Sequence, residues 1–358
     1  MKYSVDTFLR TIVRRIPLPP LQANFEPTKM CNLACDFCRR HESSSVAQIK
    51  GVGAHFTQNQ FKEALSKLKH VRVINWIGDG EPLMNPDFNK LIEMSADRGI
   101  RTTFTTNGVL VTKKDIEFWK KHKVVRISCS VDTPDPERYK ELRLGGTLDK
   151  PAQTCKWISE SGIYLQMSSV LLAENIEGIP RFVDFAKEIG ARRIALSRPH
   201  LVGTLTKYSS SYPDPVVANP ILKIALDKAK KAKMDWHRPW YISPYHRRCM
   251  VPFVSLYIQI GGDIQSCCFM MGGDRIEDFD GVSYKIPVSN FRMGNILTDG
   301  FGEIWHGDAY KELRNLLIKS ERPVGTTVGL ERIHALRRNT DSRFSSCLGC
   351  LWRWSTSC

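Results

Sequence analysis

The chain has 358 residues, of which 42% are hydrophobic, and its aromatic residues include 16 Phe, 10 Tyr and 8 Trp. This composition excludes an intrinsically disordered chain, and the length is sufficient for a large core. The formal net charge of +15 favours an acidic partner, but charge alone does not distinguish a nucleic acid, a phosphorylated substrate and an acidic electron donor.

Residues 1–21 are predicted to form an N-terminal extension with an amphipathic helix. Its apolar residues, such as Phe8 and Ile12, alternate with arginines, which favours packing on the folded core over contact with a membrane surface. The segment has no signal-peptide pattern, and no apolar run in the chain approaches the roughly 20 residues of a membrane span. We therefore expect a cytoplasmic protein without a transmembrane segment. In that compartment, 11 cysteines favour metal or redox chemistry over disulfides.

Three cysteines follow the first predicted strand, residues 21–27. Cys31, Cys35 and Cys38 are so closely spaced that one short loop can wrap three thiolates around a single metal centre. Iron–sulfur clusters normally take four cysteines, so three would leave one iron open to another ligand, as on catalytic zinc. A zinc-binding or incidental cysteine triplet is the alternative at this point.

Residues 22–205 alternate short β-branched segments with amphipathic segments, which predicts repeated βα units and a parallel sheet. The predicted strands are residues 21–27, 72–77, 101–105, 124–131, 164–171 and 192–197. The predicted helices are residues 57–68, 86–97, 113–121, 136–143, 148–161 and 179–189. Six strands are too few for a closed eight-stranded barrel, so we expect an open partial barrel with ligands at the carboxyl ends of its strands.

Polar or glycine-rich motifs follow three of these strands, where a ligand would bind. The motifs are Gly78-Asp79-Gly80-Glu81-Pro82, then Thr105-Thr-Asn-Gly108, then Ser130-Val-Asp-Thr133 followed by Arg143-Leu-Gly-Gly146. Taken alone, the glycine-rich motif is also typical of an ordinary βα turn.

The cysteine loop and these motifs together resemble the radical S-adenosylmethionine (radical SAM) enzymes. Cys31-Asn-Leu-Ala-Cys35-Asp-Phe-Cys38 matches their CxxxCxxC signature, including the aromatic Phe37 before the third cysteine. The later motifs occur in the order that the family shows, although Asp79 stands where its GGEP motif has a glycine. The resemblance covers nearly the whole chain and disfavours the zinc alternative. It implies an α/β fold, a partial (βα)6 TIM-like barrel.

The resemblance also implies a 4Fe-4S cluster whose open iron is chelated by S-adenosylmethionine. One electron then splits the sulfonium to give a 5′-deoxyadenosyl radical, chemistry that belongs to the cofactors. The glycine-rich motif would bring backbone carbonyls to the methionine ammonium, Phe37 would pack near the adenine, and Ser130 and Arg143 would contact the ribose or the carboxylate. Asn107 is a further candidate, although Asn in such a turn more often orders the turn itself. The implied cofactor-binding residues are Phe37, Gly78, Asp79, Gly80, Glu81, Asn107, Ser130 and Arg143.

Residues 206–245 are predicted to be a linker, with a loop followed by a helix near residues 220–233. Residues 246–358 are predicted to form a second domain. It begins with a hairpin, residues 254–260 and 264–268, around Gly261-Gly262-Asp263.

The second domain contains another group of cysteines. The Cys347/Cys350 pair is a CxxC motif, which alone is compatible with zinc or a redox disulfide. The surrounding motifs resemble the SPASM or twitch extension of radical SAM enzymes; they are Met293-Gly-Asn-Ile296, Gly302-Glu-Ile-Trp305 and Lys311-Glu-Leu-Arg314. This resemblance implies an auxiliary 4Fe-4S cluster whose ligands are Cys249, Cys267, Cys347 and Cys350.

The remaining cysteines limit this match. A full SPASM domain binds two clusters and has a further cysteine after its CxxC with five residues between them, where this chain has Thr356; only Cys358 lies nearby. We therefore predict a single auxiliary cluster of the twitch form, with residues 322–344 as an insertion. Cys268 stands where sulfatase-maturing relatives have an aspartate base. It is a candidate catalytic residue, as a hydrogen-atom donor to a substrate radical, or a spare ligand, but a buried bystander is the favoured interpretation. Cys129 and Cys155 are predicted to be small buried residues.

We predict a radical SAM oxidoreductase that abstracts a hydrogen atom from a sugar, a cyclitol or another polar small molecule, with the auxiliary cluster assisting oxidation. The first alternative is a maturase of a ribosomally made peptide or protein, disfavoured because no peptide-recognition domain precedes residue 22. The second is a nucleic-acid-modifying radical SAM enzyme, but the chain lacks the strand signature of an RNA-binding module, so no stable nucleic acid is expected. The expected electron donor is an acidic protein such as flavodoxin or ferredoxin.

Overall fold

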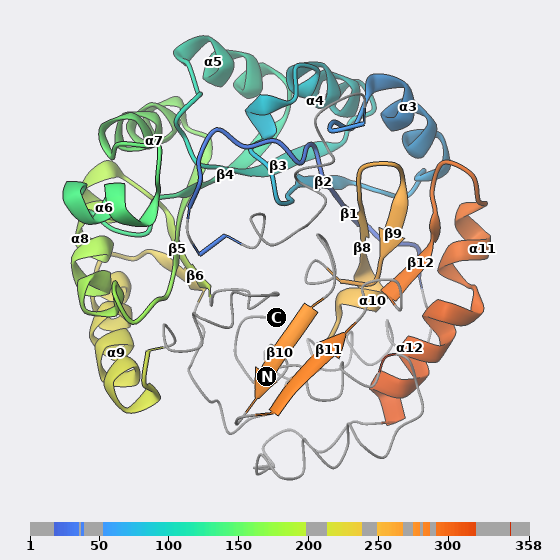
Figure 1. Ribbon diagram of the computed structural model, residues 1–358. Coiled ribbons are helices and arrows are strands. Elements are labelled where there is room, and N and C mark those ends of the chain that lie inside the picture. The colour runs from blue at the N-terminus through green and yellow to red at the C-terminus, as the bar shows by residue number, and fades with distance from the viewer. Residues whose placement is uncertain are drawn as a thin grey trace, which may run out of the picture.

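An open barrel of parallel strands, with helices on its outer side, forms most of the protein (Figure 1). The computed structural model describes residues 18–35, 37–38, 53–197, 213–237, 249–267, 275–279, 282–286, 291–319 and 344. The predicted N-terminal helix, Cys268, Cys347, Cys350, Cys358 and almost all of the 322–344 insertion lie outside the described residues.

The six predicted strands are present and lie side by side in chain order. They are β1 (Gln22–Phe25), β2 (Val73–Trp76), β3 (Arg101–Thr106), β4 (Val124–Ser130), β5 (Tyr164–Val170) and β6 (Arg193–Ser197). Each pairs in parallel with the next, which confirms the predicted partial TIM-like barrel. Parallel pairing puts all six carboxyl ends at one rim, so loops distant in sequence meet there.

The six predicted helices cover the convex side of this sheet (Figure 1). They are α3 (Gln58–Lys67), α4 (Phe88–Asp97), α5 (Lys113–Lys121), α6 (Pro136–Leu142), α7 (Asp149–Ser161) and α8 (Ile179–Ile189). Local sequence fixes several of their ends. Thr57 and Thr112 form capping boxes at the starts of α3 and α5, and Gly162 ends α7 in a left-handed conformation that glycine adopts without strain.

A continuous row of aromatic side chains fills the space between the sheet and the first helices. Neighbouring ring centroids lie 4.8 to 5.9 Å apart in edge-to-face or tilted contacts, along Phe61, Trp76, Phe88, Phe104 and Trp119. Such geometry contributes stabilisation beyond the buried area alone. The row fixes β2 and β3 against their helices, and thus holds the two loops that follow these strands.

The sheet continues beyond β6 at one edge and beyond β1 at the other, which the sequence did not predict. The linker region contains α9 (Pro215–Lys231) and then β7 (Asp235–His237), which pairs in parallel with β6. At the other edge, β8 (Ser255–Ile258) pairs in parallel with β1. The sheet then runs antiparallel through β9 (Asp263–Gln265) to β12 (Arg292–Asn295), so the expected hairpin is present as β8 and β9.

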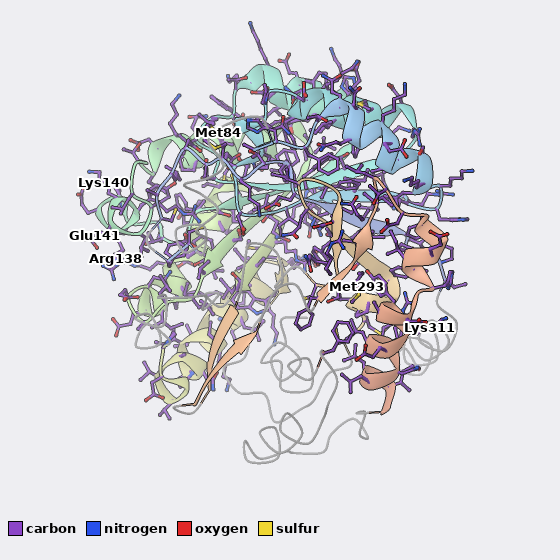
Figure 2. All side chains as sticks on the ribbon, turned by 45° about the vertical axis from the view of Figure 1, so that its right-hand side comes forward. Met84, Arg138, Lys140, Glu141, Met293 and Lys311 are labelled. Carbon is purple, nitrogen blue, oxygen red and sulfur yellow. The ribbon has the colours of Figure 1, made fainter. Side chains whose placement is uncertain are left out.

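Three helices of the C-terminal part lie beside this extended edge: α10 (Val251–Val254), α11 (Phe301–Trp305) and α12 (Asp308–Lys319). The strands β10 (Arg275–Phe279) and β11 (Val282–Ile286) form a separate two-stranded sheet. In Figure 2, Met293 on β12 and Lys311 on α12 mark this side of the protein, and Arg138 and Lys140 on α6 mark the opposite side. The division at residues 22–205, 206–245 and 246–358 stays a prediction, since one sheet crosses all three segments.

Within the described residues, no helix combines the length and the apolar character that crossing a membrane requires.

Candidate functional site

A cavity of about 170 Å³ lies where the cysteine loop meets the carboxyl ends of β2, β3 and β4. Its lining residues are Cys31, Leu33, Cys35, Phe37, Cys38, Ile77, Gly78, Gly80, Glu81, Thr105, Thr106, Asn107, Ser130 and Arg143. The lining includes all three N-terminal cysteines and every predicted cofactor-binding residue except Asp79. The tertiary structure therefore brings these separate motifs to one site.

The cysteine loop is held by hydrogen bonds to its own backbone and to the loop after β3. The amide of Leu33 lies 3.5 Å from Cys31 Sγ, and the amide of Cys38 donates to the Cys35 carbonyl at 3.0 Å. Burial raises the pKa of the Cys35 thiol to about 12, against the opposing effect of the Arg143 charge, so this sulfur needs a bound metal to become a thiolate at neutral pH.

The donor set of this loop fits an iron–sulfur cluster better than a single ion. Among the residues that the structure describes, no three His, Cys, Asp or Glu side chains converge closely enough to hold one metal ion. Each thiolate of a cluster binds a different iron atom, so the sulfurs need only face a shared space. Cys31, Cys35 and Cys38 meet that condition, because all three line the cavity.

Glu81 ties the loop after β2 to the loop after β3. Its carboxylate is buried and accepts a hydrogen bond of 2.6 Å from the Thr106 hydroxyl and one of 2.7 Å from the Asn107 amide. Burial raises the pKa of Glu81 to about 7, although these two hydrogen bonds act in the opposite direction. The carboxylate is thus occupied by protein groups and acts as a cross-link between the two loops.

Gly80 stands where no side chain would fit. A Cβ atom there would lie 2.3 Å from the carbonyl oxygen of Thr28 and 2.5 Å from that of Met30, and both of these atoms belong to the backbone. The neighbouring amide of Glu81 donates to the same Met30 carbonyl at 2.8 Å. The glycine therefore lets the β2 loop lie directly against the chain that leads into the cysteine loop.

Asp79, the departure from the family motif, is not among the residues that line the cavity. Its carboxylate lies 3.6 Å from Lys29 Nζ, which also forms an ion pair of 2.7 Å with Glu26. Burial raises the pKa of Glu26, although Lys29 lowers it. Lys29 thus partly balances two buried carboxylates, and only the backbone of Asp79 remains a candidate for cofactor binding.

Asn107 orders its own turn, as is common for Asn, and also holds the cysteine loop. Its Oδ1 accepts from the Val109 amide at 3.0 Å, and its Nδ2 donates to Asn32 Oδ1 at 2.8 Å and lies 3.9 Å from Cys31 Sγ. Asn32 was not predicted as a site residue, although its position inside the cysteine motif is a usable signal. We infer that Asn107 positions the first cysteine.

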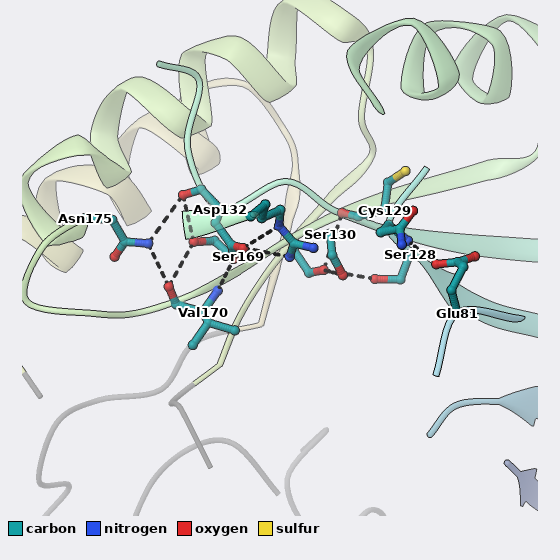
Figure 3. Close-up of polar contacts among 11 residues, drawn as sticks. Glu81, Ser128, Cys129, Ser130, Asp132, Ser169, Val170 and Asn175 are labelled. Carbon is teal, nitrogen blue, oxygen red and sulfur yellow. Dashed lines mark hydrogen bonds and ion pairs between the residues drawn. The ribbon is translucent and has the colours of Figure 1, made fainter. Parts of the chain in front are cut away.

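Arg143 is oriented by an acid that the sequence analysis did not assign. Asp132 Oδ2 accepts hydrogen bonds from Arg143 Nε at 2.7 Å and from Nη2 at 2.6 Å, and both side chains are buried. Asp132 is itself fixed after β4, because the Val170 amide donates to its Oδ1 at 2.7 Å (Figure 3). Burial would lower the pKa of Arg143, but Asp132 raises it, so the guanidinium stays charged beside the cavity. Its contact with a bound carboxylate stays a prediction.

The concave face of the barrel carries polar side chains below the cavity. Ile127 and Cys129 are buried in the core under the helices, so the alternate residues Ser128 and Ser130 of β4 face the concave side. Ser168 of β5 lies 3.3 Å from the Ser130 hydroxyl and 3.4 Å from that of Ser128, and Figure 3 labels these two serines of β4.

A second polar row crosses the first three strands of the same sheet. Asn75 Nδ2 donates to Asn24 Oδ1 at 3.0 Å, and the Thr103 hydroxyl donates to Asn75 Oδ1 at 2.8 Å. Closed barrels fill their interior with branched apolar residues. These polar rows instead form hydrogen bonds across the concave side of the sheet, and period-two alternation in the strands is the signal that would have identified them.

Of the second cysteine group, the structure describes Cys249 and Cys267. Cys249 lies just before α10, Cys267 lies just after β9, and both are partly buried against the core. Phe344, three residues before Cys347 in sequence, packs against Phe291 with ring centroids 5.4 Å apart. The amide of Ser266 donates to the Phe291 carbonyl at 3.2 Å, so residue 344 lies near the segment that contains Cys267. The four-ligand set and the role of Cys268 stay predictions.

Cys129 and Cys155 are fully buried, which confirms the prediction for both. A hydrogen bond between the two thiols and their burial raise the pKa of Cys155.

Comparison with known proteins finds two matching families. Residues 25–186 match the radical SAM superfamily, and residues 249–351 match SPASM, an iron–sulfur cluster-binding domain. The AdoMet-dependent heme synthase of Methanosarcina barkeri is 24% identical over 299 residues, which cover 81% of this chain and 84% of that protein. The PqqA peptide cyclase of Granulibacter bethesdensis is 23% identical over 249 residues, which cover 68% of this chain and 65% of that protein.

A solved structure has the same fold over both parts of the chain. Streptococcus suis SuiB, in a crystal structure with the precursor peptide SuiA, superposes with a TM-score of 0.63 at 19% identity. The match covers 87% of this chain and 71% of that chain. At this identity the likeness establishes the fold alone.

Proposed function

Because the chain is a radical SAM enzyme with a SPASM domain, we propose that it modifies a ribosomally made peptide or protein. The similarity to PqqA peptide cyclase carries this proposal, and the fold shared with SuiB, which was crystallised with a precursor peptide, supports it. The radical SAM and SPASM domains imply a 4Fe-4S cluster, S-adenosylmethionine and auxiliary iron–sulfur binding.

Different residues at the site would bind the cluster, bind S-adenosylmethionine and orient these binding groups. Cys31, Cys35 and Cys38 would hold the first cluster, and the Gly78–Glu81 backbone and Arg143 would hold S-adenosylmethionine. When bound, these cofactors supply reductive sulfonium cleavage and hydrogen-atom abstraction. The protein contributes orientation, because Asp132 fixes Arg143 and Asn107 fixes the cysteine loop.

The polar rows on the concave face support a substrate that presents many hydrogen-bonding groups. A peptide backbone offers a donor and an acceptor at almost every residue. The serines of β4 and β5 would then meet the substrate directly below the cavity, whereas an apolar lining would leave the backbone groups unsatisfied.

The preferred sequence interpretation, a sugar or cyclitol substrate, gains no support from the comparisons, which favour the peptide alternative. A tetrapyrrole is the second candidate, because the match to the heme synthase spans most of both chains. The oxidoreductase outcome and an acidic flavodoxin or ferredoxin donor are part of the proposal, and the net charge of +15 supports the donor.

The first prediction concerns Cys31→Ala in anaerobically reconstituted protein. We expect about eight iron atoms per chain in the native protein and about four in the variant, because one of two four-iron clusters loses a ligand. Reductive formation of 5′-deoxyadenosine should be abolished in the variant. Cys155→Ala, which changes a cysteine outside both ligand groups, is the control and should retain iron and activity. If fully reconstituted native protein forms no 5′-deoxyadenosine, the proposed chemistry is wrong.

Deuterium transfer identifies the substrate class. Deuterated peptides encoded beside this gene, a deuterated porphyrin and deuterated cyclitols would each be incubated with the enzyme and S-adenosylmethionine. We expect label in 5′-deoxyadenosine only from a peptide. Transfer only from the porphyrin would favour the second candidate, and transfer from a cyclitol would overturn the peptide proposal.

A further inference from the structure

Arg314 on α12 is a buried cation with no acidic partner among the residues that the structure describes. Its side chain is only 4% exposed. Nε donates to the Pro252 carbonyl at 2.9 Å and Nη1 to the Trp305 carbonyl at 2.6 Å. Nη2 is buried and has no hydrogen-bond partner among the described residues. The acceptors of both hydrogen bonds are neutral carbonyl groups, so these bonds do not neutralise the positive charge of Arg314.

Aromatic rings flank the guanidinium but do not replace a counter-ion. The carbon atom Cζ lies 4.2 Å from the ring centroid of Trp305 and 4.7 Å from that of Tyr310. Burial lowers the pKa of Arg314 to about 10, so the side chain is still charged at neutral pH. An uncompensated buried charge is strongly destabilising, and aromatic contacts offset only part of that cost. A negative group is therefore expected nearby.

Arg314 contacts Pro252 and Tyr310, which connect it to the segments of the two described SPASM cysteines. Pro252, which accepts the Nε hydrogen bond, is three residues after Cys249. The Tyr310 ring lies against the Arg314 guanidinium, and burial raises the pKa of the Tyr310 hydroxyl, with Cys267 as a smaller influence in the same direction. The Tyr310 hydroxyl, like Arg314 Nη2, is buried and has no hydrogen-bond partner in the described part of the chain. Both donors are therefore available to a group that binds beside these segments.

We propose that Arg314 is the counter-charge of the auxiliary iron–sulfur cluster and raises its reduction potential, with Tyr310 as a second donor toward the same cluster. Four thiolates give such a cluster a net negative charge, and reduction adds another. A fixed positive charge stabilises the reduced form more than the oxidised form. Arg314 is therefore a positioning residue that acts through the cluster. The inference rests on the auxiliary cluster of the proposed function and is independent of the substrate.

The test uses the full chain with Cys31, Cys35 and Cys38 all changed to Ala, so that only the auxiliary cluster is measured. A redox titration followed by electron paramagnetic resonance would compare the reduction potential of this cluster in three proteins: the one that retains Arg314, Arg314→Lys and Arg314→Met. For Arg314→Met we expect the ratio of reduced to oxidised cluster, at a fixed ambient potential, to fall at least about tenfold, which is about 59 mV for one electron. Arg314→Lys retains the charge and should restore most of the potential.

Lys311→Met is the matched control, because it removes a positive charge from the exposed face of the same helix. Solvent screens that charge, so the potential should stay unchanged. An unchanged potential in Arg314→Met at full iron content would overturn the proposal, and so would equal losses in the Lys and Met variants, which indicate a purely structural role.

Tyr310→Phe keeps the ring and removes only the hydroxyl, so it covers the case in which Arg314→Met fails to fold. We expect a smaller fall in potential at unchanged iron content, and no fall would count against the proposal. If the chain without the three N-terminal cysteines binds no iron, the auxiliary cluster itself is absent. That result contradicts the SPASM part of the proposed function. It differs from the outcome in which the cluster forms but its reduction potential does not depend on Arg314.

Discussion

The Arg143–Asp132 ion pair shows how one buried contact organises the rim of the barrel. Asp132 adopts a positive φ of 66°, which a non-glycine residue rarely does, and it receives hydrogen bonds from Arg143 and from the Val170 amide. The strained backbone places the carboxylate where it can hold the guanidinium next to the cavity. Backbone strain of this kind persists only where surrounding contacts maintain it.

Asp132→Asn tests the energetic role of this pair. The variant leaves the buried Arg143 charge uncompensated, so we expect a loss of about 3–5 kcal/mol in the free energy of unfolding. The exposed Lys140–Glu137 pair supplies the control, because Glu137→Gln should cost less than about 1 kcal/mol. Anaerobic urea unfolding of both variants measures the difference. Equal effects would contradict the importance assigned to burial.

At the scale of elements, the loop after β2 depends on close backbone contact. Gly80 lies against the carbonyl oxygens of Thr28 and Met30, and the hydrogen bond from the Glu81 amide to Met30 holds this approach. The carboxylate of Glu81 then fixes the loop after β3. Two βα loops therefore form one unit with the chain that enters the cysteine loop.

Gly80→Ala should disturb this unit. The added Cβ would overlap two backbone oxygens that cannot move independently, so we expect a loss of about 1–3 kcal/mol or more and a lower iron content in the first cluster. Gly302→Ala is the control: it lies in α11 with no atom within 4 Å of the new Cβ, and we expect a gain of about 0.5–1 kcal/mol. Thermal unfolding and iron analysis check both. Native stability and iron content in Gly80→Ala would contradict the close approach.

At the scale of the whole molecule, the barrel and the C-terminal part share one sheet and several side-chain contacts. Lys67 at the end of α3 donates to the carbonyls of Ile296, Leu297 and Asp299 at 2.8, 3.0 and 3.2 Å. The Asn24 side chain of β1 donates to the Leu256 carbonyl of β8 at 3.1 Å. These contacts predict that the two parts unfold together.

Lys67→Met tests that coupling. Three carbonyls of the turn after β12 lose a charged donor, so we expect the free energy of unfolding to fall by about 1–3 kcal/mol within one cooperative transition. Lys62→Met on the exposed face of α3 should leave stability nearly unchanged. Urea unfolding followed by fluorescence and by cluster absorbance measures this. Two separate transitions would mean that the parts unfold independently.

The sequence by itself determined the six strands and six helices of the barrel, because their apolar periodicity and capping residues are local properties. It also identified the cysteine loop and the motifs after β2, β3 and β4, since ligand chemistry restricts residue type and spacing within a short segment. Of the residues in these segments predicted to bind the first cluster or S-adenosylmethionine, all but Asp79 line one cavity.

Only the tertiary structure decided which distant groups pair. No local pattern encodes partners that lie from 11 to more than 200 residues apart in sequence. Examples are the pairs Asp132 and Arg143, Lys29 and Asp79, and β8 and β1. The short strand β7 was missed for the same reason, because pairing with β6 defines it. The polar concave face and the burial of the Arg314 charge likewise arise only when the sheet curves and the helices pack. The folded structure determines which side chains are buried, and therefore how much free energy each charged group costs.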